Sequence, residues 1–161
     1  MENSLILKGV IFDTTANSPV IILKLSDKEL YLPIWIGIFE AQAIILKLDN
    51  IITPRPMTHD LLNNLIKELG ITVEKVVLSD LIDNTYYAEI YLNKDGKQYI
   101  IDSRPSDAIA LALRYDCNIF AGENLMQKAP FIDLTSEGDE KEQLKKWLEE
   151  LDPELLGEYE M

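Results

Sequence analysis

The sequence YIIDSRPSDAIALALRY, residues 99–115, predicts a strand, a tight turn and a buried helix. Its first three residues are strand formers, and Pro105 fixes φ in what we expect to be the first turn of a helix. In this helix isoleucine and leucine alternate with alanine, so it is apolar all round and has to be buried on more than one side. Polar chemistry is therefore confined to its N-terminal end, where residues 102–107 carry charged and hydroxyl groups beside unpaired backbone N–H groups.

An earlier stretch has the same form. Residues 30–48, LYLPIWIGIFEAQAIILKL, read as an apolar strand, a break at Gly37 and a helix rich in small residues. Superposing the two stretches puts Glu40 over Asp107, and two further strand-like runs precede each of them. This suggests a duplicated unit of three strands and a helix. Coincidence between two buried helices explains the match equally well, so the sequence leaves both readings open.

The remaining pattern predicts an α+β fold, with a mixed, largely antiparallel sheet and packed helices. Thr58 is a suitable N-cap for a second helix, whose leucine-rich stripe we expect to lie opposite a polar outer face. Asp95 and Gly96 predict a tight hairpin. Ser136 can cap a last, charged helix, which we expect either to cover the core or to face a second subunit. Further strands are expected at residues 5–14, 20–25, 30–36, 72–83, 86–93 and 119–120.

Length and composition limit the class of protein. A chain of 161 residues with 47% hydrophobic content can bury a stable core without disulfides or structural metals. The single Cys117 excludes an internal disulfide and a cysteine-based zinc site. The sequence begins with no signal-peptide pattern and has no run of 18 apolar residues, so we expect a cytoplasmic protein that does not span a membrane.

The net charge of -13 is concentrated toward the C-terminus. Residues 136–160 carry ten acids and three lysines, net -7, which leaves 18 acids and 12 bases, net -6, elsewhere. Such a surface repels polyanions, so broad electrostatic capture of DNA or RNA is disfavoured. Any role on nucleic acid must rest on a local cationic spot or a bound metal.

Two of the three arginines sit in similar corners. Arg55 and Arg104 each precede a proline and lie a few residues before an aspartate, Asp60 or Asp107, and the sole histidine, His59, lies in the first corner. Arginine suits bidentate recognition of phosphate or carboxylate. Equally, both arginines can pair internally with nearby acids and brace the two buried helices.

A metal site is a second possibility for these residues. Hard divalent ions such as Mg²⁺ or Mn²⁺ take carboxylate oxygens and activate water for phosphodiester cleavage. No spacing enforces such a site, because acids in first helical turns are favoured without any metal. The candidates are Glu40, His59, Asp60, Asp102 and Asp107, with Asp102 and Asp107 as the metal ligands.

Four separated motifs resemble the bifunctional nuclease domain family. They are LPIWIGIFEAQAI (32–44), RPMTHDLL (55–62), DNTYYAEIYL (83–92) and DSRPSDAIALALR (102–114), in the family's order. The resemblance covers roughly residues 5–135. It divides the chain into a bifunctional-nuclease-like domain over residues 1–135 and an acidic C-terminal helix and tail over residues 136–161.

The resemblance implies a compact α/β domain, a homodimer and, in some members, a nuclease that acts on both DNA and RNA. Carried over by position, the functional residues are those named above: Glu40, Arg55, His59, Asp60, Asp102, Arg104 and Asp107. The leading hypothesis is a metal-dependent nuclease of DNA or RNA. The alternatives are a non-enzymatic dimeric module that binds a small anion or a partner protein at the Arg-Pro turns, and a purely structural network of enclosed charges.

Overall fold

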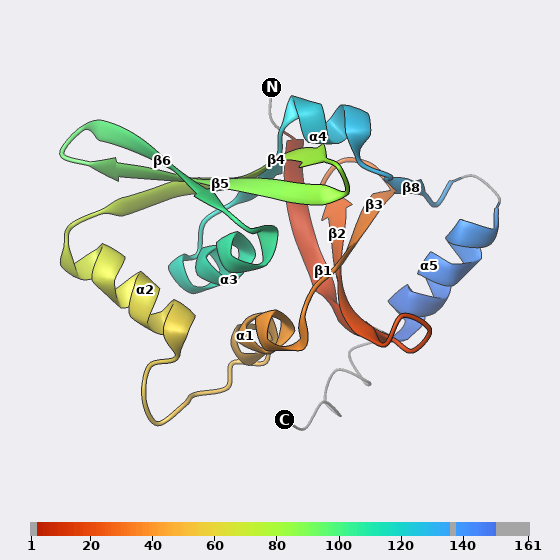
Figure 1. Cartoon of the computed structure of the whole chain (residues 1–161), viewed down its shortest axis with the longest axis horizontal. Helices are drawn as coiled ribbons and strands as arrows, with labels where there is room; N and C mark the ends of the chain where they lie inside the picture. The colour runs from red at the N-terminus through yellow and green to blue at the C-terminus, as the bar shows by residue number, and fades with distance from the viewer. Residues whose placement is uncertain (1–2, 136–137, 151–161) are drawn as a thin grey trace.

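The computed structural model describes residues 3–135 and 138–150, in which strands and helices follow one another as two similar blocks (Figure 1). The first block contains β1 (Asn3–Asp13), β2 (Ser18–Leu25), β3 (Leu30–Trp35) and α1 (Ile38–Leu48). After α2 (Thr58–Glu68), the second contains β4 (Thr72–Ile82), β5 (Thr85–Lys94), β6 (Lys97–Ser103) and α3 (Pro105–Tyr115). The chain continues through β7 (Ile119–Ala121), α4 (Glu123–Lys128), β8 (Ile132–Asp133) and α5 (Asp139–Glu150).

All the described strands form one sheet in the order β6-β5-β4-β7-β1-β2-β3-β8. Every neighbouring pair is antiparallel except β4 with β7, so the predicted mixed, largely antiparallel sheet is confirmed. Each block contributes three sequential strands joined by tight turns. Asp95 and Gly96 both adopt positive φ in the β5–β6 turn, as the predicted hairpin requires.

The sheet is covered on both faces of its β1–β3 half. In β2, Ile21 and Leu23 belong to the main core with α1 and α3, whereas Val20 and Ile22 pack with Trp147 of α5. Successive residues of a strand point to opposite faces, so a strand buried on both faces is a continuous apolar run. Figure 1 shows α5 on the opposite side of these strands from α1 and α3.

The helix α3 lies at the centre of the molecule, as its sequence predicts. Eight of its eleven residues are buried, including Ile109 and Leu111, and α1 and α2 both pack against it. The N-terminal ends of α1 and α3 follow equivalent strands, β3 and β6, so the arrangement of the two blocks matches the predicted repeat of three strands and a helix. Ser136, the expected cap of the last helix, lies outside the described residues.

The helix α2 departs from its expected orientation. Its buried residues are Asn63 and Ile66, while Leu61, Leu62, Leu65 and Leu69 are between 38% and 57% exposed. The leucine stripe therefore faces away from the chain's own core, contrary to the expected polar outer face. Thr58 is the first helical residue and not the cap, since Met57 holds the N-cap position and donates its backbone N–H to Asp60 Oδ2 at 2.9 Å. None of the described helices is long and apolar enough to span a bilayer.

Candidate functional site

A hollow of about 740 Å³ lies between α1 and α2 and reaches the N-terminal end of α3. Its walls are apolar, with Phe39 of α1 facing the leucines of α2. At one end four polar side chains gather: Glu40, His59, Arg104 and Asp107. The apolar faces of two helices and the polar first turn of a third therefore meet in one concave surface.

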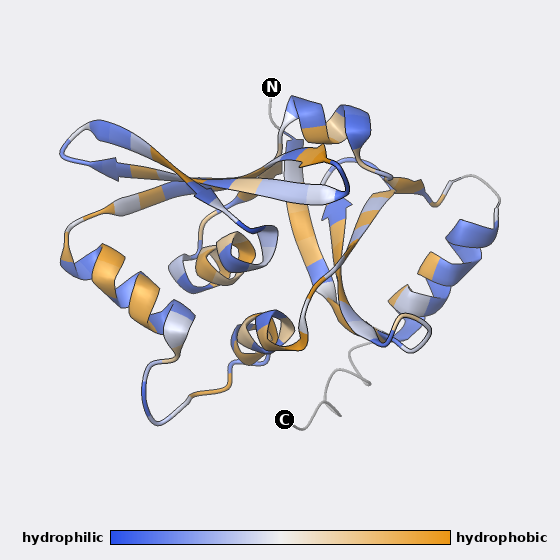
Figure 2. Ribbon diagram, viewed as in Figure 1, coloured by the Kyte–Doolittle hydropathy of each residue, from blue (hydrophilic) through white to orange (hydrophobic). Residues whose placement is uncertain are grey.

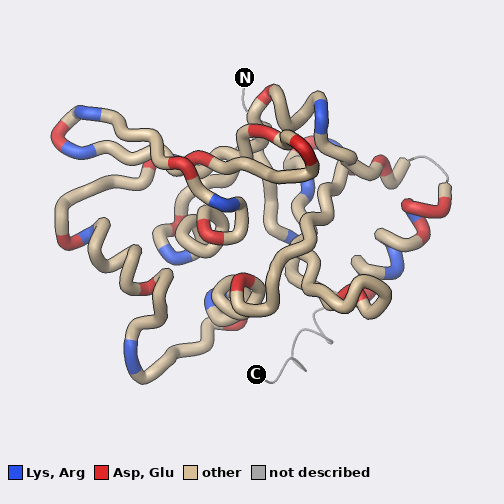
Figure 3. Tube along the Cα trace, viewed as in Figure 1, with Lys and Arg blue, Asp and Glu red and all other residues tan. Residues whose placement is uncertain are grey.

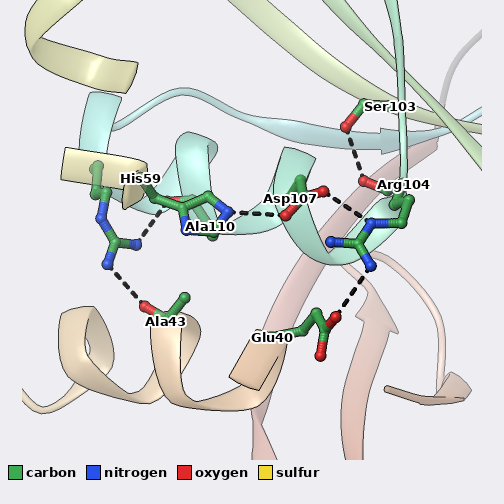
Figure 4. Close-up of polar contacts among 8 residues, drawn as sticks. Glu40, Ala43, His59, Ser103, Arg104, Asp107 and Ala110 are labelled. Carbon is green, nitrogen blue, oxygen red and sulfur yellow. Dashed lines mark hydrogen bonds and ion pairs between the residues drawn. The ribbon is translucent and has the colours of Figure 1, made fainter. Parts of the chain in front are cut away.

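The four polar side chains form a continuous chain of contacts (Figure 4). His59 Nε2 lies 2.8 Å from Asp107 Oδ1, and the other carboxylate oxygen of Asp107 accepts from Arg104 Nε at 2.9 Å. Arg104 Nη1 then donates to Glu40 Oε1 at 3.0 Å. The histidine of one Arg-Pro corner is thus joined to the aspartate of the other, and Glu40 and Asp107, equivalent in the superposed stretches, hold the same guanidinium.

Within this chain of contacts His59 is largely buried and Arg104 is exposed. Burial raises the pKa of the Asp107 carboxyl, but hydrogen bonds from Arg104 and His59 outweigh burial, so this pKa lies below its usual value. Hydrogen bonds to Asp107 and Glu40 raise the pKa of Arg104. The Arg104 side chain is 63% exposed, whereas that of His59 is 16% exposed. The network is therefore not the fully enclosed one that the structural alternative requires.

Arg104 also borders two shallower hollows. One contains Tyr86, Tyr87 and Asp102, and the other contains Trp35 and Asn84. Asp102 thus shares a hollow with Asp107 but forms no hydrogen bond or ion pair with the four clustered side chains. The guanidinium of Arg104 stands where three concave surfaces meet, which makes it the most accessible charged group of the cluster.

A third arginine, Arg114, braces the helices behind the site. Its side chain is 4% exposed, and its Nε donates to Asp60 Oδ1 at 2.7 Å. The two Nη atoms donate to the backbone oxygens of Ala110 and Ala43 at 3.0 and 2.9 Å. One guanidinium thereby ties α1, α2 and α3 together. Asp60, a candidate catalytic residue from the sequence, is engaged in this bracing contact.

Arg55 does not join the cluster. It lines a separate hollow of about 510 Å³ together with Lys47, which Asp60 borders and His59 does not. Within residues 3–135 and 138–150 neither cation makes a side-chain hydrogen bond or ion pair. The two Arg-Pro corners therefore meet through His59 and Asp107, and their arginines serve different concave surfaces.

The donor set does not suit the divalent metal expected from the sequence. Both oxygens of Asp107 already accept hydrogen bonds, from His59 and from Arg104. A hard divalent ion needs several oxygen ligands converging on one point. Among the residues that the structure describes, no group of three or more histidine, cysteine, aspartate or glutamate side chains is placed to hold a metal ion. The clustered side chains are engaged with one another, and binding of Mg²⁺ or Mn²⁺ stays a prediction.

Sequence reasoning missed two features of the site. The first is the bracing of the three helices by Arg114. The sequence did contain a signal for it, because a single arginine in an otherwise apolar helix has to find partners when that helix is buried. The second is the position of Phe39, which is 80% exposed beside Glu40 and lines the hollow. The sequence had no signal for this exposure, since an aromatic residue in an apolar helix is normally part of the core.

This geometry defines a class of protein: an α+β domain in which a histidine, an aspartate, an arginine and a glutamate form a cluster between three helices. The bifunctional nuclease domain model matches residues 21–133, and this chain belongs to that family. A Mycobacterium tuberculosis (strain H37Rv) protein named only as uncharacterized is 34% identical over 156 residues, covering 91% of this chain and 93% of its own length.

Plant relatives carry the nuclease name. Bifunctional nuclease 1 of Oryza sativa subsp. indica is 32% identical over 98 residues, which is 58% of this chain and 30% of the plant protein. Bifunctional nuclease 2 of Oryza sativa subsp. japonica is 31% identical over 104 residues, which is 62% of this chain and 32% of the plant protein. The similarity to proteins named as nucleases therefore covers about a third of their length.

Proposed function

We propose that this protein cleaves phosphodiester bonds of DNA or RNA at the cluster of His59, Asp107, Arg104 and Glu40. The single observation that carries the proposal is the contact of His59 Nε2 with Asp107 Oδ1 at 2.8 Å, next to an accessible guanidinium in the same hollow. Membership of the bifunctional nuclease domain family supports the same reaction class.

His59 is the general base in this proposal. The Asp107 carboxyl, with its lowered pKa, is ionised at neutral pH, so it accepts the proton on Nε2 and leaves Nδ1 as the basic nitrogen. Nδ1 takes a proton from the attacking oxygen, which belongs to water or to an RNA 2′-hydroxyl. A new P–O bond forms as the bond to the leaving oxygen breaks on the opposite side of phosphorus. The leaving oxygen takes a proton from water, and His59 afterwards releases its added proton to solvent.

Arg104 stabilises the negative charge that develops on the phosphoryl oxygens. Its Nε and Nη1 are held by Asp107 and Glu40, so the guanidinium is oriented before substrate arrives. The two carboxylates also offset its charge, which keeps ground-state attraction for polyanions weak. Recognition of a nucleic-acid substrate then depends on how well the substrate fits the hollow more than on long-range electrostatic attraction. This agrees with the net charge of -13, which repels polyanions.

The test is a cleavage assay on purified protein with labelled single-stranded and duplex DNA and RNA. His59→Gln and Arg104→Gln are each expected to lower the rate at least 100-fold, while Lys67→Gln, on the far turn of α2, leaves it unchanged. Wild-type protein with no activity on any of these substrates, or equal activity in His59→Gln, would refute the proposal.

The second candidate function is a non-enzymatic module that binds a small anion. It is favoured by the hollow of Lys47 and Arg55, whose two cations lack side-chain partners among the described residues. Calorimetric titration of inorganic phosphate distinguishes the two. Binding that Arg55→Gln abolishes and Arg104→Gln leaves intact, in a protein without cleavage activity, would establish this function instead.

A further inference from the structure

The hollow that contains Tyr87 and Asp102 lies where β5 begins and β6 ends, and it reaches Arg104 and Asp107. Its volume of about 410 Å³ falls in the range of pockets that hold small organic ligands. Figure 2 shows β6 changing from hydrophobic to hydrophilic residues as it approaches α3. The hollow is therefore a compartment with aromatic and polar walls, and it adjoins the proposed site of cleavage.

Tyr87 and Asp102 place an aromatic ring and a carboxylate on the same face of the sheet. Glu89 pairs with Asp102 in the β5–β6 register, and Tyr87, two residues before Glu89, lies on the same face. Tyr87 and Asp102 are thus diagonal neighbours, a spacing that an aromatic side chain can reach across. Tyr87 is 39% exposed, and Asp102 is exposed too. Neither side chain has a hydrogen-bond or ion-pair partner within residues 3–135 and 138–150.

We propose that this hollow binds one nucleobase of a single-stranded substrate, next to the phosphate that Arg104 holds. The inference rests on the proposed function, because it takes Arg104 as the residue that contacts the scissile phosphate. An aromatic ring beside a cation is typical of sites for single strands, in which a base stacks on the ring while the backbone meets the positive charge. A base in a duplex is already stacked and paired, so the duplex has to open before its base can enter.

The carboxylate of Asp102 selects the kind of base. Figure 3 shows acidic segments on both sides of a basic segment where β6 leads into α3. Arg104 is held by Asp107 and Glu40, which leaves Asp102 as the acid that can meet a base. A carboxylate only accepts hydrogen bonds, and the amino groups of cytosine and adenine donate them, whereas thymine has a carbonyl oxygen at the equivalent position. We therefore expect amino-bearing bases to bind in preference to thymine.

Fluorescence anisotropy with short, labelled single strands of oligodeoxycytidine and oligothymidine tests the proposal. Every protein carries His59→Gln, so that the strands are not cleaved during the titration. This parent is expected to bind the cytosine strand about 10-fold more tightly than the thymine strand, a difference that one hydrogen bond to a charged group supplies. Asp102→Asn should bring the ratio to about 1, because an amide both donates and accepts hydrogen bonds. Asp95→Asn removes the same charge outside the hollow and should leave the ratio unchanged.

Tyr87→Ala tests the stacking surface. It should weaken the binding of both strands about 10-fold, since stacking on an aromatic ring depends little on the identity of the base. Tyr87→Phe retains the ring and should bind as the parent does. The matched control is Tyr99→Ala on β6, because Tyr99 is 42% exposed and does not line this hollow. Annealing either strand to its complement should lower its affinity at least 10-fold.

Three results would each overturn the proposal: equal binding of the two strands by the parent, an unchanged ratio in Asp102→Asn, or equal losses in Tyr87→Ala and Tyr99→Ala. Asp102→Asn keeps the test decisive even where Tyr87→Ala disturbs the fold, since it is a nearly isosteric change of an exposed side chain. Cleavage by wild-type protein without these preferences would refute the base site alone. These preferences in a protein that does not cleave would refute the proposed reaction and leave the base site in place.

Discussion

His59 and Asp107 are 48 residues apart in the chain and lie 2.8 Å apart in the fold, measured from Nε2 to Oδ1. The contact joins the first turn of α2 to the first turn of α3. Each residue would be an ordinary first-turn polar group on its own helix. Together they place an imidazole beside a carboxylate, and the guanidinium of Arg104 shares that carboxylate in the same hollow.

Asp107→Asn tests the role of this carboxylate. An amide keeps the shape of the side chain but is uncharged and has one acceptor oxygen, so it can accept from only one of His59 and Arg104 and presents an N–H₂ group to the other. We therefore expect the cleavage rate to fall by about 10²- to 10⁴-fold. Thermal unfolding should show a folded protein. Asp116→Asn, at the left-handed C-cap of the same helix, is the control, because asparagine tolerates that conformation. Equal losses in both variants would point to a general effect on α3.

Chelation tests whether cleavage needs a metal. Because both oxygens of Asp107 accept hydrogen bonds from the protein, we expect cleavage to continue in excess EDTA. The measurement is the rate before and after dialysis against EDTA, then after adding Mn²⁺ or Mg²⁺. Loss of activity in EDTA with recovery on Mn²⁺ would show that the carboxylates exchange these internal partners for a metal ion.

Arg114 and Arg104 should differ in their effect on stability, although both belong to α3 or its N-cap. Arg114→Met removes a buried guanidinium and leaves Asp60 and the Ala43 carbonyl without their donor, which should lower the free energy of unfolding by about 3 kcal/mol. Arg104→Met, at an exposed position, should cost no more than about 1 kcal/mol. Urea unfolding measures both. Equal values would mean that Arg114 does not brace the helices.

Acid should destabilise the protein through Asp60 and Asp107. Burial raises the pKa of Asp60, but hydrogen bonds from the Met57 N–H and Arg114 outweigh it, so the pKa of Asp60, like that of Asp107, lies below the ordinary 3.8. A carboxyl with a lowered folded-state pKa stabilises the fold above its unfolded-state pKa and loses that contribution as pH falls through the folded value. We therefore expect the free energy of unfolding to decline below about pH 4.

The urea midpoint, followed from pH 6 to pH 3, measures this decline. Asp60→Asn should be less stable than wild type at pH 6 and should show a shallower loss toward pH 3, because its side chain no longer titrates. A wild-type midpoint that stays constant down to pH 3 would mean that neither carboxylate contributes in the folded state.

Local sequence patterns predicted much of the scaffold. Pro105 at the start of α3, the Asp95-Gly96 turn and the apolar run at residues 20–25 each predict an element, and all three are found. The direction in which α2 faces was not predictable. A leucine stripe indicates which face is apolar, but whether that face meets the chain's own core or another molecule depends on the helix's neighbours.

The site divides in the same way. The sequence alone identified the reactive groups, which are the two Arg-Pro corners with their acids and the single histidine. It could do so because residue type and position at the start of a helix are local properties of the sequence. Only the tertiary structure decided that His59 meets the carboxylate of Asp107, which Arg104 also contacts. It also decided that Arg55 lies in a separate hollow beside Lys47 and that Arg114 ties the helices together. The contacts of His59 with Asp107 and of Arg114 with Ala43 join residues that are 48 and 71 positions apart. Arg55 and His59, by contrast, are close in the sequence but line different hollows. They follow from how α1, α2 and α3 pack, which no local pattern encodes.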